Sequence, residues 1–169
     1  ANTVLRRPAV SVTPSDEHDV AMLKIDIPES LSKVTMRDSY DEVKPGQTVT
    51  VMGYPGVAPE EFVVRKSNDP FNPQTQFTTM PTPTVTTGNI GRVIPASSDK
   101  NLTYSGFGDS YQLTINATGA GNSGGPMFDE KGNVVGIYYA GASGGGANIS
   151  FAVPIKYGLE LMGRKKIDK

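Results

Sequence analysis

A serine stands among glycines in the stretch "GAGNSGG", with Gly121, Ser123 and Gly125 in the pattern Gly-x-Ser-x-Gly. A serine hydroxyl is a weak nucleophile, which becomes reactive when a base removes its proton and backbone N–H groups stabilise the developing oxyanion. Glycines allow tight turns and a close approach of the backbone to a substrate. The stretch indicates acyl-transfer chemistry at Ser123, and the alternative is a glycine-rich loop with an incidental serine.

The residues around Ser123 separate two kinds of serine hydrolase. In α/β-hydrolases the serine lies between a strand and a helix, and the acid and the histidine follow it in the chain. Here Ser123 is followed by "PMF" and a polar turn at residues 129–133, which predict a hairpin. The only histidine, His18, lies before Ser123. The residues around Ser123 therefore fit the other kind of serine hydrolase, in which the catalytic residues follow one another along the chain in the order His, Asp, Ser.

Short strands dominate the elements that must position this serine. Apolar alternation and turn residues predict strands at 9–12, 20–27, 47–54, 84–94, 110–116, 126–140 (a hairpin) and 148–154, with a further strand at 61–66. Only residues 154–166 have a helical pattern, with Ile155, Leu159 and Met162 on one face. Many short strands and one terminal helix predict an all-β barrel or sandwich.

Composition excludes several classes of function. The formal net charge is −1, with acids and bases interspersed, so neither nucleic acid nor an anionic membrane is an expected partner. The absence of cysteine excludes disulfides, thiolate metal sites and a cysteine nucleophile. No run is long and apolar enough for a membrane span, and the scattered acids and single histidine predict no metal site. No cofactor is expected.

Several segments, in order over residues 10 to 160, resemble trypsin-like serine proteases. "GNSGGPMFDEKGNVVGI" resembles the serine segment of that family, closest to the disulfide-free bacterial HtrA/Deg branch, and "HDVAMLKID" resembles its acid segment. "VKPGQTVTVMGYPG" is similar to the end of the first barrel, "TVTTGNIGRVI" to the opening of the second and "ISFAVPI" to its closing strand.

The resemblance implies a two-lobed double β-barrel with an incomplete first barrel and a short C-terminal helix. On this interpretation residues 1–56 form the C-terminal part of the first barrel and residues 57–84 connect the barrels. Residues 85–154 form the second barrel, which carries the nucleophile, and residues 155–169 form a helix and tail.

The resemblance also assigns roles at the site. Asp19 is the acid that orients a histidine, and the N–H groups of Gly121 and Ser123 form the oxyanion hole. His18 is adjacent to Asp19 at the start of a strand, so the two side chains point to opposite faces, and His18 is expected to be solvated. The family places its base tens of residues upstream. We therefore expect the catalytic histidine on a missing upstream segment that completes the first barrel, and negligible hydrolysis by this chain alone.

Specificity follows from the same alignment. The base of the substrate pocket is Ala117, and its walls are Tyr139, Ala140, Gly141, Ile149 and Phe151. None of these residues carries a charge, which predicts small or medium aliphatic residues before the scissile bond. The alternative is that these apolar residues belong to the barrel core.

The expected function is that of a serine endopeptidase. Its substrates are extended or unfolded polypeptides, since a cleft between two barrels accepts a strand-like chain. A periplasmic or extracytoplasmic location in a bacterium is implied only by analogy with the family. The rival interpretation is a catalytically silent module that keeps the protease fold and binds peptides without a base.

Overall fold

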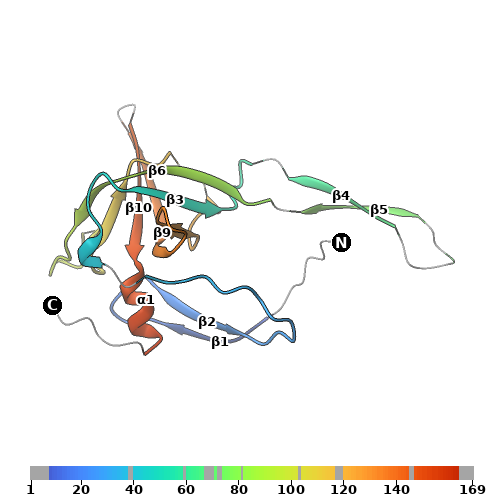
Figure 1. Ribbon diagram of the computed structural model, residues 1–169, viewed down its shortest axis with the longest axis horizontal. Helices are drawn as coiled ribbons and strands as arrows, with labels where there is room; N and C mark the ends of the chain where they lie inside the picture. The colour runs from blue at the N-terminus through green and yellow to red at the C-terminus, as the bar shows by residue number, and fades with distance from the viewer. Residues whose placement is uncertain are drawn as a thin grey trace.

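The computed structural model describes residues 8–37, 40–58, 60–66, 71, 74–80, 82–102, 104–116, 120–144 and 147–163, and of residues 65, 66, 76, 78 and 147 only the backbone. Figure 1 shows a barrel, a ribbon of two strands projecting from it, and a second two-stranded sheet beside the only helix of the described residues that is α-helical. The prediction of an all-β protein with one short C-terminal helix is confirmed.

Six strands close into one barrel, in the order β10-β7-β6-β3-β8-β9. Neighbouring strands pair antiparallel around the whole barrel. The bounds of these strands are β3 (Thr48–Gly53), β6 (Thr84–Ile94), β7 (Ser110–Leu113), β8 (Pro126–Phe128), β9 (Val134–Gly144) and β10 (Ala147–Pro154). Closure leaves none of the six with an unpaired edge, which removes the usual liability of an edge strand.

The barrel core follows from the period of two along its strands. In β3, Val49 and Val51 are buried, whereas Thr48 and Thr50 are partly exposed. Side chains alternate between the faces of a strand, so this pattern sends the valines inward. The buried residues of the core are Val49, Val51, Ile90, Tyr111, Leu113, Ile115, Met127, Val135, Tyr138 and Ala152.

One assignment from the sequence is wrong. Residues 48–53 were expected to close the first barrel, but β3 pairs with β6 and β8 inside the closed barrel. The alternation of valine and threonine predicts a half-buried strand without specifying its neighbours. The pairing with β8 brings the end of β3 next to the segment that carries Ser123.

Two strand pairs lie outside the barrel. β1 (Ala9–Pro14) pairs with β2 (Ala21–Ile25), and β4 (Glu61–Lys66) pairs with β5 (Thr75–Met80). The second pair falls within residues 57–84, which the sequence assigned to a connector containing one strand at 61–66. The structure gives that strand and its partner β5, so much of the connector is a β-ribbon that extends away from the barrel (Figure 1).

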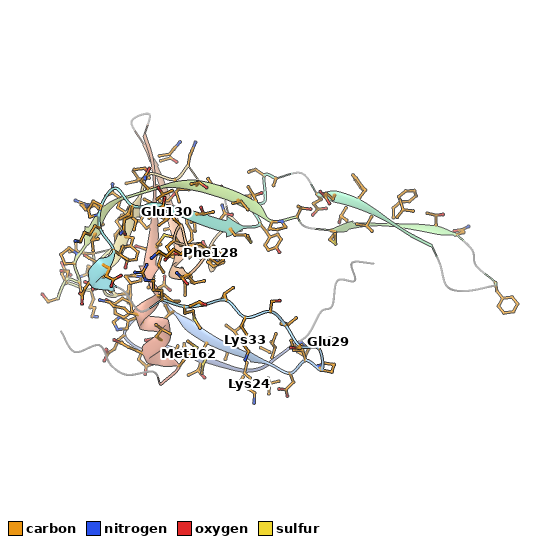
Figure 2. The ribbon with its side chains drawn as sticks, in the orientation of Figure 1. Lys24, Glu29, Lys33, Phe128, Glu130 and Met162 are labelled. Carbon is orange, nitrogen blue, oxygen red and sulfur yellow. The ribbon has the colours of Figure 1, made fainter. Side chains whose placement is uncertain are left out.

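The segment after β2 returns to the barrel. Figure 2 shows Lys24 on the β1–β2 pair, Lys33 on the returning segment, and Phe128 in the barrel. The return ends at a parallel bridge between Met36 and Val134, and a short 3₁₀ helix, η1 (Tyr40–Glu42), precedes β3. This bridge attaches the return segment to the start of β9.

The helix α1 (Ile155–Leu161) begins directly after β10. Its buried residues Ile155 and Leu159 pack with Val134, and Tyr157 packs with Val20. The helix is shorter than predicted: Met162, expected on the same face, lies beyond its end and is partly exposed, and the predicted residues 164–166 lie outside the described residues. In the part of the chain that is described, no helix has the length and apolar character needed to cross a membrane.

Candidate active site

Ser123 lies on a tight turn just before β8. Gly121 has φ of +108° and Gly124 has φ of +85°, a region of backbone conformation that favours glycine. The side chain of Ser123 is exposed, and a strand follows the turn, as the hairpin prediction required. The local backbone therefore presents the hydroxyl on the surface of the barrel and differs from the strand-to-helix turn of an α/β-hydrolase.

The turn packs closely against the end of β3. A Cβ atom on Gly121 would lie 2.1 Å from the carbonyl oxygen of Tyr54, and one on Gly125 would lie 2.3 Å from that of Met52. A Cβ atom on Gly53 would lie 2.3 Å from Oδ1 of the buried Asn122. These glycines are required for space, because a backbone carbonyl has little freedom to move away from an added methyl group.

Hydrogen bonds join the turn to β9 as well. The N–H of Gly124 donates to the carbonyl of Tyr138 at 2.8 Å, and the N–H of Tyr138 donates to the carbonyl of Gly125 at 2.9 Å. The hydroxyl of Ser123 donates to the carbonyl of Tyr139 at 3.0 Å. The turn is thus held between β3 and β9, and its serine proton points at a backbone acceptor.

The two proposed oxyanion donors are on this turn. Among the residues that the structure describes, no hydrogen bond uses the backbone N–H of Gly121 or of Ser123. The carbonyl of Ala120, which shares a peptide unit with the N–H of Gly121, accepts from the N–H of Gly56 at 2.8 Å, and the carbonyl of Asn122, which shares one with the N–H of Ser123, accepts from the N–H of Gly125 at 2.9 Å. An amide donor that is held in place and not already paired is what stabilisation of an oxyanion requires.

Asp19 lies one residue before the buried Val20, at the start of β2. Its exposed side chain lines a small pocket of about 30 Å³ together with Tyr104, Ser110 and Tyr139. Burial raises the pKa of Tyr139, and the charges of Tyr104 and Asp19 raise it further, although a hydrogen bond with Ser110 lowers it. Asp19 and Tyr139 thus line the same pocket, and the carbonyl of Tyr139 accepts the bond from Ser123.

Tyr139, which was predicted only as part of the pocket wall, bonds to Ser123 through its carbonyl and lines a pocket with Asp19. Its phenol pairs with the hydroxyl of Ser110 at 3.0 Å, and Ser110 also donates to the carbonyl of Ala152 at 3.5 Å. The acceptor for Ser123 is a backbone atom, which no motif of residue types reveals. The polar residues Ser110 and Tyr139 in otherwise apolar strands were the available signal.

The expectation that His18 is solvated is wrong. Its side chain is 20% exposed, its ring stacks on Tyr157 with centroids 3.7 Å apart, and its Nδ1 donates to the carbonyl of Phe107 at 2.9 Å. These contacts direct the imidazole toward α1, whereas Asp19 lines the pocket beside Tyr139. His18 is a packing residue between β2 and α1, and within the described residues it contacts neither Asp19 nor Ser123.

Only part of the predicted substrate pocket lies within the described residues. Ala117 lies outside the described residues. The other residues come together on the β9–β10 pair, where Ala140 is opposite Phe151 and Gly141 is opposite Ser150. Phe151 is buried and stacks on Tyr104 with centroids 3.9 Å apart, so it fills space between strands. Ala140, Gly141 and Ile149 are more exposed than Phe151.

A partly buried ion pair links α1 to the residue before β7. Lys156 on α1 pairs with Asp109, which also accepts the N–H of Ala96 at 2.7 Å, and the N–H of Asp109 donates to the hydroxyl of Tyr157 at 2.7 Å. Burial raises the pKa of Asp109, but hydrogen bonds from Lys156, Ala96 and Tyr40 hold it below its usual value. Burial raises the pKa of Tyr157 to about 12.

Nothing in the described residues has the composition of a metal site. Within the described ranges, no group of three His, Cys, Asp or Glu side chains could hold a metal ion.

Comparison with known sequences gives a family. Residues 3–137 match the trypsin-like peptidase domain. The chain is 33% identical over 153 residues to a probable periplasmic serine endoprotease, DegP-like, of Marinomonas sp., and 34% identical over 155 residues to a protein with the same description from Pseudomonas putida. Each match covers 89% of this chain and 26% or 25% of the relative, so the chain spans about a quarter of their length.

Solved structures agree with the sequence comparison. A variant of the HtrA-type protease AlgW with a decapeptide has a TM-score of 0.64 at 29% identity, covering 90% of this chain and 38% of that protein. AlgW with a tripeptide has a TM-score of 0.63 at 29% identity, covering 90% of this chain and 42% of that protein. These likenesses include the barrel and extend over most of the chain.

Proposed function

The chain belongs to the trypsin-like peptidase domain family, in its HtrA/DegP-like branch, and on that premise we propose that it is the Ser123-bearing part of a serine endopeptidase. The observation that supports the proposal is the serine turn itself, where positive φ at Gly121 and Gly124 presents an exposed Ser123 whose hydroxyl donates to the carbonyl of Tyr139. Tyr139 also lines a small pocket together with Asp19. We infer that the serine and the carboxylate, which come from segments far apart in the sequence, act at one site.

The reaction assigns a role to each group. A histidine outside this chain removes the proton of Ser123 while the serine oxygen bonds to the substrate carbonyl carbon, and Asp19 orients that histidine and stabilises the imidazolium. The amides of Gly121 and Ser123 hold the oxyanion. When the C–N bond breaks, the histidine returns the proton to the leaving amine, and water then releases the acyl group. The hydroxyl of Ser123 must first turn away from the carbonyl of Tyr139.

The β1–β2 pair supports the presence of the base on an upstream segment. Every residue of both strands is exposed, including Val10, Val12, Leu23 and Ile25. Two strands with an uncovered apolar face are marginal in water and require further strands or another partner. An upstream segment that covered this face would complete the first lobe and bring its histidine to the side of the pocket where Asp19 lies.

The proposed substrates are extended or unfolded polypeptides. The bound decapeptide and tripeptide of the AlgW structures support this class by analogy. The uncharged Ala140, Gly141 and Ile149 favour small or medium aliphatic residues before the scissile bond. A profile from a peptide library is expected to be led by Val, Ala or Ile, and a profile led by Arg or Lys would refute the assignment of the pocket.

The proposed location is outside the cytoplasm. The relatives from Marinomonas sp. and Pseudomonas putida are described as periplasmic, which supports a periplasmic or extracytoplasmic site of action by analogy.

The test is hydrolysis of an unfolded polypeptide, such as casein, by the longer protein that contains this chain and its upstream segment. Ser123→Ala is expected to abolish hydrolysis, and Asp19→Asn is expected to lower kcat by roughly 10⁴-fold because the histidine loses its orienting partner. Ser143→Ala, at an exposed serine of β9, is the matched control and leaves the rate unchanged. Hydrolysis that persists in Ser123→Ala would exclude the proposed nucleophile.

A second candidate is a catalytically silent module that binds peptides. It is favoured by the position of His18, the only histidine of the chain, which packs against Tyr157 away from the site. Labelling with a fluorophosphonate distinguishes the two functions, because an enzyme forms a covalent adduct at Ser123 and a silent module does not.

A further inference from the structure

The β4–β5 ribbon carries an uncovered apolar face. Val64 is directly opposite Phe77, and Phe62 is two residues before Val64 on the same strand, so the three side chains share one face. Phe62 is 77% exposed, Val64 57% and Phe77 72%. Aromatic and β-branched side chains favour strands, but their exposure to water is unfavourable, and a cluster of this kind indicates a binding surface.

The base of the ribbon is attached to the serine turn. The chain leaves β3 through Tyr54, whose N–H donates to the carbonyl of Gly121 at 3.3 Å, and the N–H of Gly56 donates to the carbonyl of Ala120 at 2.8 Å. No space remains between Gly121 and the carbonyl of Tyr54 for a Cβ atom. A ligand held on the ribbon is consequently tethered to the domain that carries Ser123, which raises its effective concentration there.

From this arrangement we propose that the β4–β5 face is a holding site for polypeptide substrate, which binds an extended segment with apolar side chains at alternate positions. The inference rests on the proposed function and names a surface outside the pocket next to Ser123. A strand-like segment presents side chains to one face every second residue, which matches the spacing of Phe62 and Val64.

The size of the face favours a substrate segment over a second copy of the chain. A buried aromatic side chain contributes about 150–250 Å², so these three partly exposed side chains offer on the order of 400 Å². A stable interface between proteins needs about 800 Å² from each partner. A narrow apolar ribbon of this area holds a flexible segment weakly, which allows a substrate to be released and to move toward Ser123.

The experiment measures binding, so it does not depend on hydrolysis. The chain with Ser123→Ala is titrated into a fluorescein-labelled 12-residue peptide with Leu or Val at alternate positions, and anisotropy gives the Kd. Adding Phe62→Ser with Phe77→Ser is expected to weaken binding at least tenfold. A peptide with Ser in place of the apolar residues is expected to bind at least tenfold more weakly to the parent chain.

Two further variants make the result specific. Leu102→Ser, at an exposed apolar residue elsewhere, is the matched control and leaves the Kd unchanged. Val64→Asp reproduces the loss with one substitution, and circular dichroism checks that each variant is folded. An unchanged Kd in the double serine variant, or no binding by the parent chain, would overturn the inference. So would a parent dimer that the double variant converts to a monomer in sedimentation, because the face would then join two copies.

A failure of this inference is distinguishable from a failure of the proposed function. Covalent labelling of Ser123 in the longer protein can succeed when the peptide does not bind the ribbon, and the reverse outcome would leave a peptide-binding module without an active serine.

Discussion

The closed barrel and the two open strand pairs are built from similar residues, but they differ in what covers their apolar side chains. In the barrel, Val49 and Val51 on one strand are almost fully buried. In β1–β2 and β4–β5, side chains such as Leu23 and Phe62 remain exposed. Closure therefore supplies stability, whereas the open pairs supply surfaces, and Ser123, the proposed nucleophile, lies where the barrel meets the base of one open pair.

The largest expected effect on stability comes from replacing a phenylalanine of the barrel with alanine, and the same replacement on the ribbon serves as its comparison. Phe151→Ala removes a buried ring of the barrel and is expected to lower the free energy of unfolding by about 3–5 kcal/mol. Phe77→Ala on the ribbon is expected to change it by less than about 0.5 kcal/mol, since the ring is 72% exposed. Urea unfolding measures both values. Equal losses would contradict the division into a stable barrel and an open ribbon.

A glycine at the junction is expected to be the next most sensitive position. Gly121→Ala combines a strained φ with a contact of 2.1 Å to a backbone oxygen, and should cost about 3 kcal/mol in unfolding free energy. Gly132→Ala is the matched control: φ is +78°, nothing lies within 4 Å of the added atom, and about 1 kcal/mol is expected. If both variants lose the same free energy of unfolding, the close packing of the serine turn does not contribute to the cost of Gly121→Ala.

The ion pairs give a smaller and pH-dependent contrast. The pKa of Asp109 is lowered in the folded state, so its stabilising contribution is present above the unfolded value of about 3.9 and is lost as the pH falls through the folded pKa. Asp109→Asn removes the carboxylate that pairs with the partly buried Lys156 and is expected to cost about 2 kcal/mol at pH 7. The difference in free energy of unfolding between Asp109→Asn and the parent chain should become smaller below about pH 4.

Glu42→Gln tests an exposed pair for comparison. Arg37 and Glu42 form an ion pair with side chains that are 34% and 67% exposed, so the expected loss of stability is much smaller than for Asp109→Asn. Thermal unfolding from pH 7 to pH 3 measures both variants. A loss for Asp109→Asn that stays constant over this range would exclude the carboxylate as its source.

The smallest effect on the chain itself is expected at the β1–β2 face. Leu23→Ser should change the free energy of unfolding of this chain by less than about 0.5 kcal/mol, because the side chain is 61% exposed. In the longer protein the same variant should be destabilised by about 2–3 kcal/mol, since the upstream segment would then cover residue 23. Equal small effects in both proteins would show that nothing packs on this face.

Much of the fold could be predicted from local patterns. The alternation in residues 48–51, the turn at 129–133 and the helical spacing of Ile155 and Leu159 all correspond to observed elements. The partner strands of β3 could not be predicted, because alternation fixes which side chains point inward but not which strands lie beside them. Only one strand of the ribbon was predicted. The prolines and amides at 70–83 favoured a connector, so β5 was not predicted from the local sequence.

The candidate site also combines features that residue types can predict with features that only the pairing of strands determines. Ser123, Asp19, Gly121 and the pocket residues came from motifs and from a resemblance, and their roles stay predictions. The carbonyl of Tyr139 could not be found from residue types, because every residue has a carbonyl and only the pairing of strands selects one. The packing of His18 depends on Tyr157, which is far away in sequence and adjacent in space.

The most direct test of the central claim is labelling with a fluorophosphonate, followed by mass spectrometry of the adduct. The account predicts a single adduct on Ser123 in the longer protein that carries the upstream segment, and no adduct on this chain alone, because an unactivated serine loses most of the contribution of the base. A folded longer protein that gains no adduct, or gains it on another residue, would contradict the assignment of Ser123 as the nucleophile.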